Sequence, residues 1–359
     1  MFQQALAGAL LLIPLVDATA QLQPQARPLL ELRAGDRVAF VGEEVFGPER
    51  EHGFFEQMLT AEAGGAAVTF RHLSLTNGLL ASYQPTVVFL HLTPEKFLPG
   101  AEAVLSFSNR METLVSMVQT QAPAQARFVL LGPLPLERRP APQPDPGPEN
   151  TTRAGYEQAL KQVAAAHQMT FVSLLDALRY EFSNPKQRPT TNGARLNAAG
   201  SRQVAVALAG PLLGWPALNW RLSLEPDGAV QAGCHGQTVT KVQRTDQMIS
   251  FTLLADKVAN TPCMLRFKSL PPGRHALKID GRIVQEATAL EWQRALTFTT
   301  GPMFEAAEQL RLAIVRKNAL LGEGTASEIH AAQARIHQLA RPVPHQFEVV
   351  PVADSPPKP

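Results

Sequence analysis

Short apolar runs alternate with amphipathic stretches between residues 36 and about 210, and this alternation narrows the possible folds more than any other feature. Helical patterns cover 53–63, 101–121, 151–168 and 197–209. Because strands that alternate with helices form parallel sheets covered on both faces, an α/β domain is predicted here. The apolar runs have the length of buried strands and lie at 38–41, 68–70, 86–92, 127–131 and 170–172.

The pattern changes after Trp215. Runs at 220–224, 248–254, 264–267 and 275–279 have the short, partly alternating character of strands. The dipeptides Asp227-Gly228 and Asp280-Gly281 are typical of hairpin turns. We therefore predict a small antiparallel β domain over 215–300.

The C-terminal part predicts a helical hairpin over 301–342. Its first helix begins at Pro302 and ends near Leu321, and its second runs from about Thr325 to Ala340. Residues 343–359 are predicted to be a disordered tail.

A second proline-rich segment, Pro133 to Pro148, is longer than an ordinary loop, and we expect it to lie over the carboxyl edge of the sheet.

The first twenty residues resemble a signal peptide. An apolar stretch from Ala5 to Val16 precedes the small residues Ala18-Thr19-Ala20, and it is too short to span a bilayer. No Lys or Arg precedes this stretch, so a membrane-anchored or buried N-terminal helix is the alternative. We expect residues 1–20 to be removed and the protein to be exported to the periplasm or beyond, with no integral membrane span afterwards.

Charge and cysteine content exclude several function classes. A net charge of +2 without a run of Lys or Arg argues against nucleic acid as a partner. Cys234 and Cys263 are too few for a metal site, and no cofactor or metal is expected. In an exported protein they can form a disulfide that stabilises the fold by about 3–4 kcal/mol, and two independent buried thiols are the alternative.

The turn after the first predicted strand carries two carboxylates. The run from Val38 to Val41 ends at Gly42, and Glu43 and Glu44 follow at once. An α/β enzyme presents reactive side chains at this edge of its sheet. Adjacent residues at a strand end point in opposite directions, so these two carboxylates cannot flank one glycosidic bond.

The chain contains, in this order, the segments GDRVAFVGEEVFGPEREHGFFEQML, VTFRHLSLTNGLL, PTVVFLHLTPEKF and TTNGARLNAAGSRQVAVAL. These four segments resemble four blocks of the SGNH/GDSL hydrolase family, most closely multidomain bacterial members with an appended β domain and helical tail. The resemblance covers about 30–215. It implies a flavodoxin-like three-layer α/β/α SGNH-hydrolase sheet over 30–214 and an ester-hydrolase ancestry.

The resemblance fails at the residues that carry the family's chemistry. Gly42-Glu43-Glu44 replaces Gly-Asp-Ser, so Glu44 stands where the nucleophilic Ser is expected. Ser74 stands near the Gly that donates a backbone N–H to the oxyanion hole. Pro94 falls in the segment that replaces Gly-x-Asn, and a proline donates no hydrogen bond there.

The last block replaces the family's Asp-x-x-His by Asn192-Gly193-Ala194-Arg195. Arg195 stays protonated at physiological pH, so it cannot act as the general base. We expect none of these positions to be catalytic. Because the Ser and His positions face each other in the family, we predict a salt bridge between Glu44 and Arg195, with Asn192 or Glu43 close by.

The sequence therefore predicts a catalytically inactive, SGNH-like exported protein that binds a glycan or an envelope protein. An active ester hydrolase or carbohydrate O-deacetylase with non-standard residues is one alternative, and a structural module of an envelope assembly is another. We expect His72 and His91 to be buried core residues. A metal site from His52, His91, Glu43 and Glu44 lacks any familiar ligand spacing.

Overall fold

The computed structural model describes residues 28–352 with short gaps. The expected signal peptide, Cys234 and the turn at Asp227-Gly228 lie outside the described residues, so the expected disulfide and cleavage site stay predictions. Each of the helices in the described ranges is too short or too polar to cross a membrane. The gaps are 76–77, 141, 216–219, 226–228, 233–236, 246–247 and 260–261.

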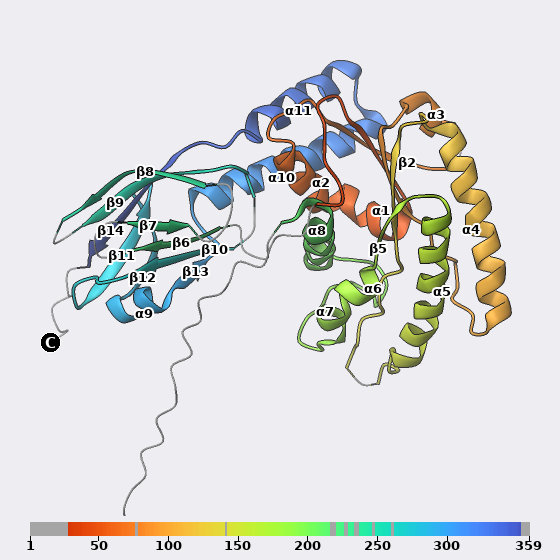
Figure 1. The fold of residues 1–359 in the computed structure, drawn as a ribbon, viewed down its shortest axis with the longest axis horizontal. Coiled ribbons are helices and arrows are strands. Elements are labelled where there is room, and N and C mark those ends of the chain that lie inside the picture. Colours follow the sequence, from red (N-terminus) through yellow and green to blue (C-terminus); the bar gives the residue numbers. More distant parts are fainter. Residues whose placement is uncertain are drawn as a thin grey trace, which may run out of the picture.

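A parallel sheet forms the centre of the first domain (Figure 1), in the order β2-β1-β3-β4-β5. All five strands are parallel, and the order in which they are added along the sheet reverses between β1 and β3, where doubly wound sheets carry their sites. The predicted fold class is confirmed. The strands are β1 (Arg37–Val41), β2 (Thr69–Leu73), β3 (Val87–His91), β4 (Arg127–Leu131) and β5 (Thr170–Val172).

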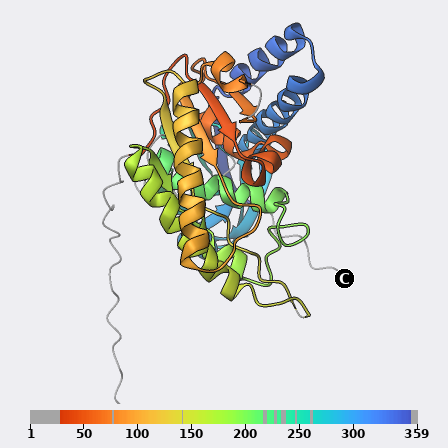
Figure 2. The ribbon, with the colours of Figure 1, turned by 90° about the vertical axis from the view of Figure 1, so that its right-hand side faces the viewer.

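Helices cover both faces of this sheet, as Figure 2 shows with α4 in front. One face packs against α1 (Glu43–His52), α2 (Phe54–Glu62) and α8 (Ala198–Leu213). The other face packs against α4 (Ala101–Gln121) and α5 (Gly147–Ala166). Short helices complete the domain, namely α3 (Leu79–Tyr83), α6 (Leu174–Ala177) and α7 (Arg179–Ser183).

Burial along the strands explains the two-sided packing. Phe40 and Phe89 point to the α1 and α8 face, whereas Ala39 and Val88 point to the α4 and α5 face. All four side chains are buried, since successive residues of a strand face opposite sides of the sheet. Continuous apolar strands are therefore required, and the sequence supplies them.

The second domain is a β sandwich of two sheets. One has the order β13-β10-β6-β7 and the other β12-β11-β14-β9-β8. The prediction of an antiparallel domain needs one correction, because β6 and β10 pair in parallel. The strands are β6 (Trp220–Leu224), β7 (Val230–Ala232), β8 (Gln237–Arg244), β9 (Ile249–Ala255), β10 (Cys263–Phe267), β11 (Arg274–Ile279), β12 (Arg282–Thr288), β13 (Leu296–Phe298) and β14 (His345–Pro351), with α9 (Ala289–Arg294) between β12 and β13.

The prediction of a disordered tail over 343–359 is wrong for β14 (His345–Pro351). This strand lies between β11 and β9 and pairs with both. Its inward residues Phe347 and Val349 are buried, and Phe347 stacks on Phe251 with ring centroids 4.9 Å apart. The prolines on both sides of this segment favoured the prediction of a disordered tail. The strand is short and alternating, and its partners β11 and β9 are distant in sequence.

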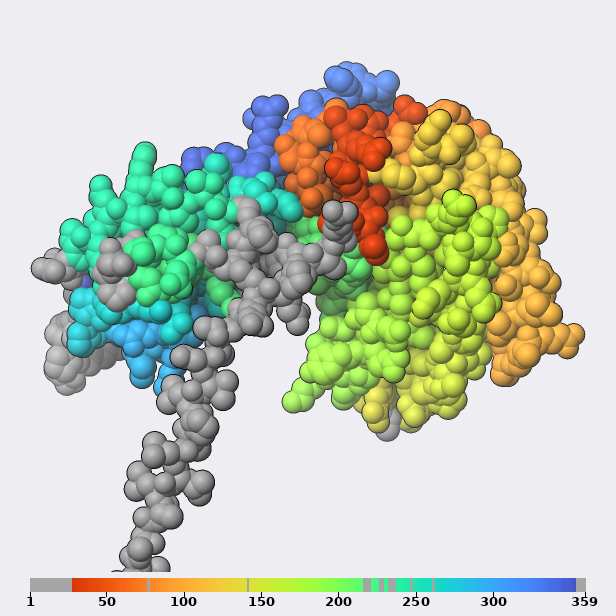
Figure 3. Space-filling model, viewed as in Figure 1, coloured from red at the N-terminus to blue at the C-terminus, as the bar shows by residue number. Residues whose placement is uncertain are grey.

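The two helices α10 (Pro302–Glu323) and α11 (Ala326–Leu339) form the expected hairpin and join the two domains. Figure 3 shows them, in blue, along the upper edge between the two lobes. α10 packs against α1 and α2, where Gln57 Nε2 donates to the Ala307 carbonyl at 2.7 Å. Arg311 Nη1 donates to the His52 carbonyl at 2.6 Å. The hairpin is therefore attached to the α/β domain by polar contacts as well as apolar ones.

Candidate functional site

The turn between β1 and α1 is fixed by Gly42. Its φ is 124°, a conformation that side-chain-bearing residues rarely adopt. A Cβ at this position would lie 2.1 Å from the His91 carbonyl oxygen. Glycine therefore lets the first turn of α1 approach the end of β3 closely, and the N-terminus of α1 favours the negative charges of Glu43 and Glu44.

Glu44 points from this turn toward the segment after β3. Thr93 Oγ1 donates to Glu44 Oε2 at 3.2 Å, and His91 Nε2 lies 3.9 Å from the same oxygen. The other carboxylate oxygen lies 3.9 Å from Arg153 Nη1. The Glu44 side chain retains 29% exposure, so it is held by a cation and a hydroxyl but is still reached by water.

Arg153 belongs to this candidate site, although the sequence analysis did not name it. It projects from α5, is buried, and donates from Nη1 to the Leu134 carbonyl at 3.0 Å. Its guanidinium carbon lies 4.1 Å from the centroid of the Phe97 ring. Burial lowers the pKa of Arg153, and Glu44 and Glu149 oppose this effect. One sequence signal could have indicated that Arg153 is buried. Glu149 and Arg153 stand four residues apart on a predicted helix, and the residues that follow on the same buried face are apolar.

His91 contributes a buried, neutral imidazole. Its side chain is completely buried, and burial lowers its pKa more than Glu44 raises it. The expectation that His91 is a core residue is confirmed. His72 is also buried, and burial together with the charge of Lys317 lowers its pKa to about 3.

Arg195 does not meet Glu44, and the predicted salt bridge is wrong. Arg195 instead pairs with Glu51, in the last turn of α1, and about half of its side chain is exposed. The hydrogen bond to Glu51 and the charge of Glu51, with a smaller effect of Glu43, raise the pKa of Arg195. The long side chain reaches an acid near water, which avoids the cost of desolvating a buried charge pair.

Asn192 shapes the loop that carries Arg195. Its Oδ1 accepts hydrogen bonds from the backbone N–H groups of Ala194 at 3.1 Å and Arg195 at 2.8 Å. The side chain therefore supports a turn, as Asn commonly does. Glu43 lies beside Gly47 one turn along α1, on the face toward Arg195. The two adjacent carboxylates therefore face different groups: Glu43 lies toward Arg195, and Glu44 contacts Thr93 and Arg153.

Ser74 and Pro94 lie in the loops that follow β2 and β3. Ser74 is exposed, and Pro94 is half-buried directly after Thr93. His52 lies at the end of α1 beside Arg311, away from Glu44 and His91. In the described part of the chain, no group of three His, Cys, Asp or Glu side chains has the arrangement of a metal site.

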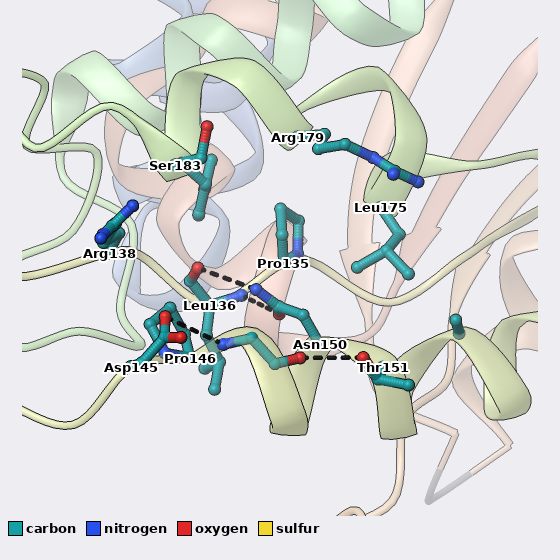
Figure 4. A pocket seen from close by; sticks show the side chains of 13 residues that line it. Pro135, Leu136, Arg138, Asp145, Pro146, Asn150, Thr151, Leu175, Arg179 and Ser183 are labelled. Atoms are coloured by element: carbon teal, nitrogen blue, oxygen red, sulfur yellow. Dashed lines mark hydrogen bonds between the residues drawn. The ribbon is translucent and has the colours of Figure 1, made fainter.

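A cavity of about 400 Å³ lies under the proline-rich segment that follows β4 (Figure 4). The segment does lie at the carboxyl edge of the sheet. Asn150 fixes it, because its Oδ1 accepts from the Leu136 N–H at 2.8 Å and its Nδ2 donates to the Leu136 carbonyl at 3.4 Å. The walls include Pro135, Leu136, Arg138, Asp145, Asn150, Thr151, Leu175, Arg179, Phe182 and Ser183.

Comparison with known proteins defines the fold. No protein-family model and no curated protein matches the sequence. The structure of a gut microbial diltiazem-metabolizing enzyme matches 90% of this chain and 99% of its own, with a TM-score of 0.68 and 11% identity. That similarity covers most of the chain and concerns the fold alone.

Two solved structures match about half of this chain. A putative GDSL-like lipase from Parabacteroides merdae covers 52% of this chain and 100% of its own length, with a TM-score of 0.39 and 12% identity. Axe2, an acetylxylan esterase from Geobacillus stearothermophilus, covers 50% of this chain and 94% of its own, with a TM-score of 0.37 and 14% identity. The sheet order and the helices on both faces define a flavodoxin-like α/β/α fold, which is the fold that the resemblance to SGNH/GDSL hydrolases predicts.

Proposed function

We propose that this chain is an exported, catalytically inactive SGNH-like protein that binds a glycan or a protein partner. One observation carries the proposal. The side chain at the nucleophile position, Glu44, is engaged by Thr93 and Arg153, while the residue at the base position, Arg195, is bonded to Glu51. The two positions that must exchange a proton in an SGNH hydrolase are directed to different partners.

The chemistry supports loss of ester hydrolysis. Acyl transfer on this plan needs a hydroxyl whose proton passes to an imidazole. An acyl adduct of Glu44 would be an anhydride, and the Arg195 guanidinium takes up no proton. Pro94 also lacks the donor that the family supplies at this place, and losing one oxyanion donor alone costs about 3–4 kcal/mol of transition-state stabilisation.

One contact favours a rival function. The Thr93 hydroxyl donates to Glu44, so a working hydrolase would use Thr93 as nucleophile and Glu44 as its base. The buried Arg153 would then stabilise negative charge on the substrate. Because this alternative requires the Thr93 hydroxyl as nucleophile, a variant without that hydroxyl distinguishes the two functions.

The proposed ligand would bind at the carboxyl edge of the parallel sheet, and not by stacking on a tryptophan ring. Trp292 is fully buried in the β domain. Trp215 donates from Nε1 to Glu62, and the Lys257 ammonium lies 5.2 Å from its ring centroid. Both rings are therefore engaged in packing within the protein, so sugar stacking would have to use other groups.

Activity measurements test the proposal directly. The purified chain should hydrolyse neither p-nitrophenyl acetate and butyrate nor acetylated xylo-oligosaccharides, and a fluorophosphonate probe should not label it. Turnover that is lost in Thr93→Val, but kept in the exposed control Thr120→Val, would overturn the inactive assignment and establish the rival. Thr120 is a suitable control because its hydroxyl donates only within α4, to the Met117 carbonyl.

Two further experiments address ancestry and export. The triple variant Glu44→Ser, Asn192→Asp, Arg195→His should gain little activity, because Pro94 still lacks the oxyanion donor; circular dichroism establishes that it folds. N-terminal sequencing of the secreted or periplasmic protein should begin at or near Gln21. A full-length chain in the cytoplasm would contradict export without affecting the catalytic argument.

A further inference from the structure

We propose that the cavity under the proline-rich segment binds a small carboxylate that carries an apolar body, such as an aromatic ring or a short chain. This goes beyond the proposed function, because it assigns a second site with its own ligand class. Its volume of about 400 Å³ lies in the range that small-molecule sites usually have.

The cavity floor supplies the apolar part of the recognition. Pro135, Leu175 and Phe182 are buried, and Leu136 is half-buried beside them. In Figure 4, Pro135 and Leu136 lie near the middle of the view, with Leu175 to the right. A ligand without an apolar body would leave this floor covered only by water, which is unfavourable for apolar surface.

Two arginines supply the charge. Figure 4 shows Arg138 and Arg179 on opposite sides of the cavity. Arg179 is already paired with Asp176 at 2.5 Å. Arg138 takes part in none of the ion pairs that the described residues form, and its side chain is exposed at the cavity wall. Arg138 is therefore the cation that is available to a ligand.

The remaining charge in the cavity favours a ligand with a single negative charge over one with two. Asp145 lines the cavity, and its Oδ1 accepts from the Gly147 N–H at 3.3 Å at the start of α5. This carboxylate repels a dianion such as a phosphate about twice as strongly as it repels a monocarboxylate at the same distance. One guanidinium suits one carboxylate well, since its planar fork donates two parallel hydrogen bonds.

The cavity is held in shape before any ligand arrives. Asn150 clamps the backbone of Leu136, and the Arg138 N–H donates to the Phe182 carbonyl at 2.7 Å. Pro135 and Pro146 further restrict the segment. Because little has to be ordered on binding, a small ligand can bind with useful affinity.

Calorimetry and ligand-observed NMR on the purified full-length chain test the site. The probes are phenylacetate and hexanoate, with the neutral analogues 2-phenylethanol and hexanol. The acids should bind and the alcohols should bind roughly tenfold more weakly or not at all. Arg138→Gln removes the charge-assisted pair between the guanidinium and the ligand carboxylate. This variant should therefore bind phenylacetate roughly tenfold more weakly or worse.

Two variants serve as comparison. Arg139→Gln is the matched control, because the neighbouring Arg139 side chain lies over Gly193 in the adjacent loop and does not line the cavity. It should leave phenylacetate binding unchanged. Ala154→Trp fills the cavity from α5 and should abolish binding while the circular dichroism spectrum stays the same.

Three outcomes would overturn the proposal. They are the absence of binding of both acids up to about 10 mM, equal binding of acids and alcohols, and equal losses in Arg138→Gln and Arg139→Gln. Detection of ester hydrolysis would instead contradict the proposed function, and it would leave the binding result intact.

Discussion

Lys317 on α10 and Glu56 on α2 form an ion pair whose side chains are only 2% and 1% exposed. Asn318 Nδ2 donates to the other oxygen of the same carboxylate at 3.0 Å. A buried pair of this kind adds little net stability, because both charges lose their hydration. It does fix how the helical hairpin sits on the α/β domain, since any other placement leaves a buried charge without its partner.

Replacing Lys317 with Met should destabilise the chain by about 3–5 kcal/mol, because the Glu56 carboxylate is left buried without its cation. Urea unfolding monitored by circular dichroism measures the change. Lys317→Met combined with Glu56→Gln should recover a large part of the loss. Arg282→Met is the exposed comparison, because Arg282 pairs with Glu305 at 2.7 Å near water, and it should leave stability nearly unchanged. Equal losses in the two single variants would contradict this account.

Stability should fall in acid through His72. Burial and Lys317 lower its pKa from 6.5 to about 3, so the folded protein keeps this imidazole neutral while the unfolded chain protonates it. Between these two values the unfolded state binds the extra proton, so the free energy of unfolding decreases as pH falls from 6.5 toward 3. The 4.0 Å approach to Glu56 does not reverse this effect, because burial and the nearby Lys317 outweigh it.

His72→Phe tests this pH dependence, because it removes the titrating group and keeps a ring next to Phe40, whose centroid lies 5.0 Å away. Urea unfolding at several pH values from 4 to 7 should give a shallower slope for the variant, by up to about 1.4 kcal/mol per pH unit. Parallel curves for the two proteins would show that His72 does not carry the effect.

Arg153→Met should cost about 1–3 kcal/mol of stability, because the Leu134 carbonyl loses a buried hydrogen bond and Glu44 loses its cation. Thermal unfolding gives the measurement. Arg195→Met makes the same change of side chain in an exposed ion pair and should leave the melting temperature nearly unchanged. If Arg195→Met lowers the melting temperature as much as Arg153→Met does, the account of Arg153 as the stabilising cation is wrong.

Phe347→Ala should destabilise the β domain by about 3–5 kcal/mol, because Phe347 is fully buried in β14 and stacks on Phe251. Limited proteolysis should then cut within the β domain first. Gln346→Ala, on the exposed side of the same strand, should lose only its hydrogen bond from Thr252 Oγ1 at 2.9 Å. An unchanged proteolysis pattern in Phe347→Ala would contradict the role of β14.

Local patterns predicted the α/β domain well because its elements are strongly periodic. The range 101–121 matches α4 (Ala101–Gln121) at both ends, and 127–131 matches β4. Helix α1 was missed, since its ten residues include Pro48 and several charges and show no clear apolar face. Strand β14 was missed because a short strand is stabilised by neighbours from other parts of the chain.

The sequence by itself determined the fold class, the position of the turn at Gly42 and the presence of Glu44 and Arg195 at positions where the resemblance to SGNH/GDSL hydrolases implies a serine and a histidine. These follow from short-range periodicity and from the chemistry of single side chains. The tertiary structure alone decided that Glu44 lies with Thr93 and Arg153, and that Arg195 turns to Glu51. Long, flexible charged side chains have several acids or bases within reach, so their partners depend on burial and on distances that spacing along the chain does not encode.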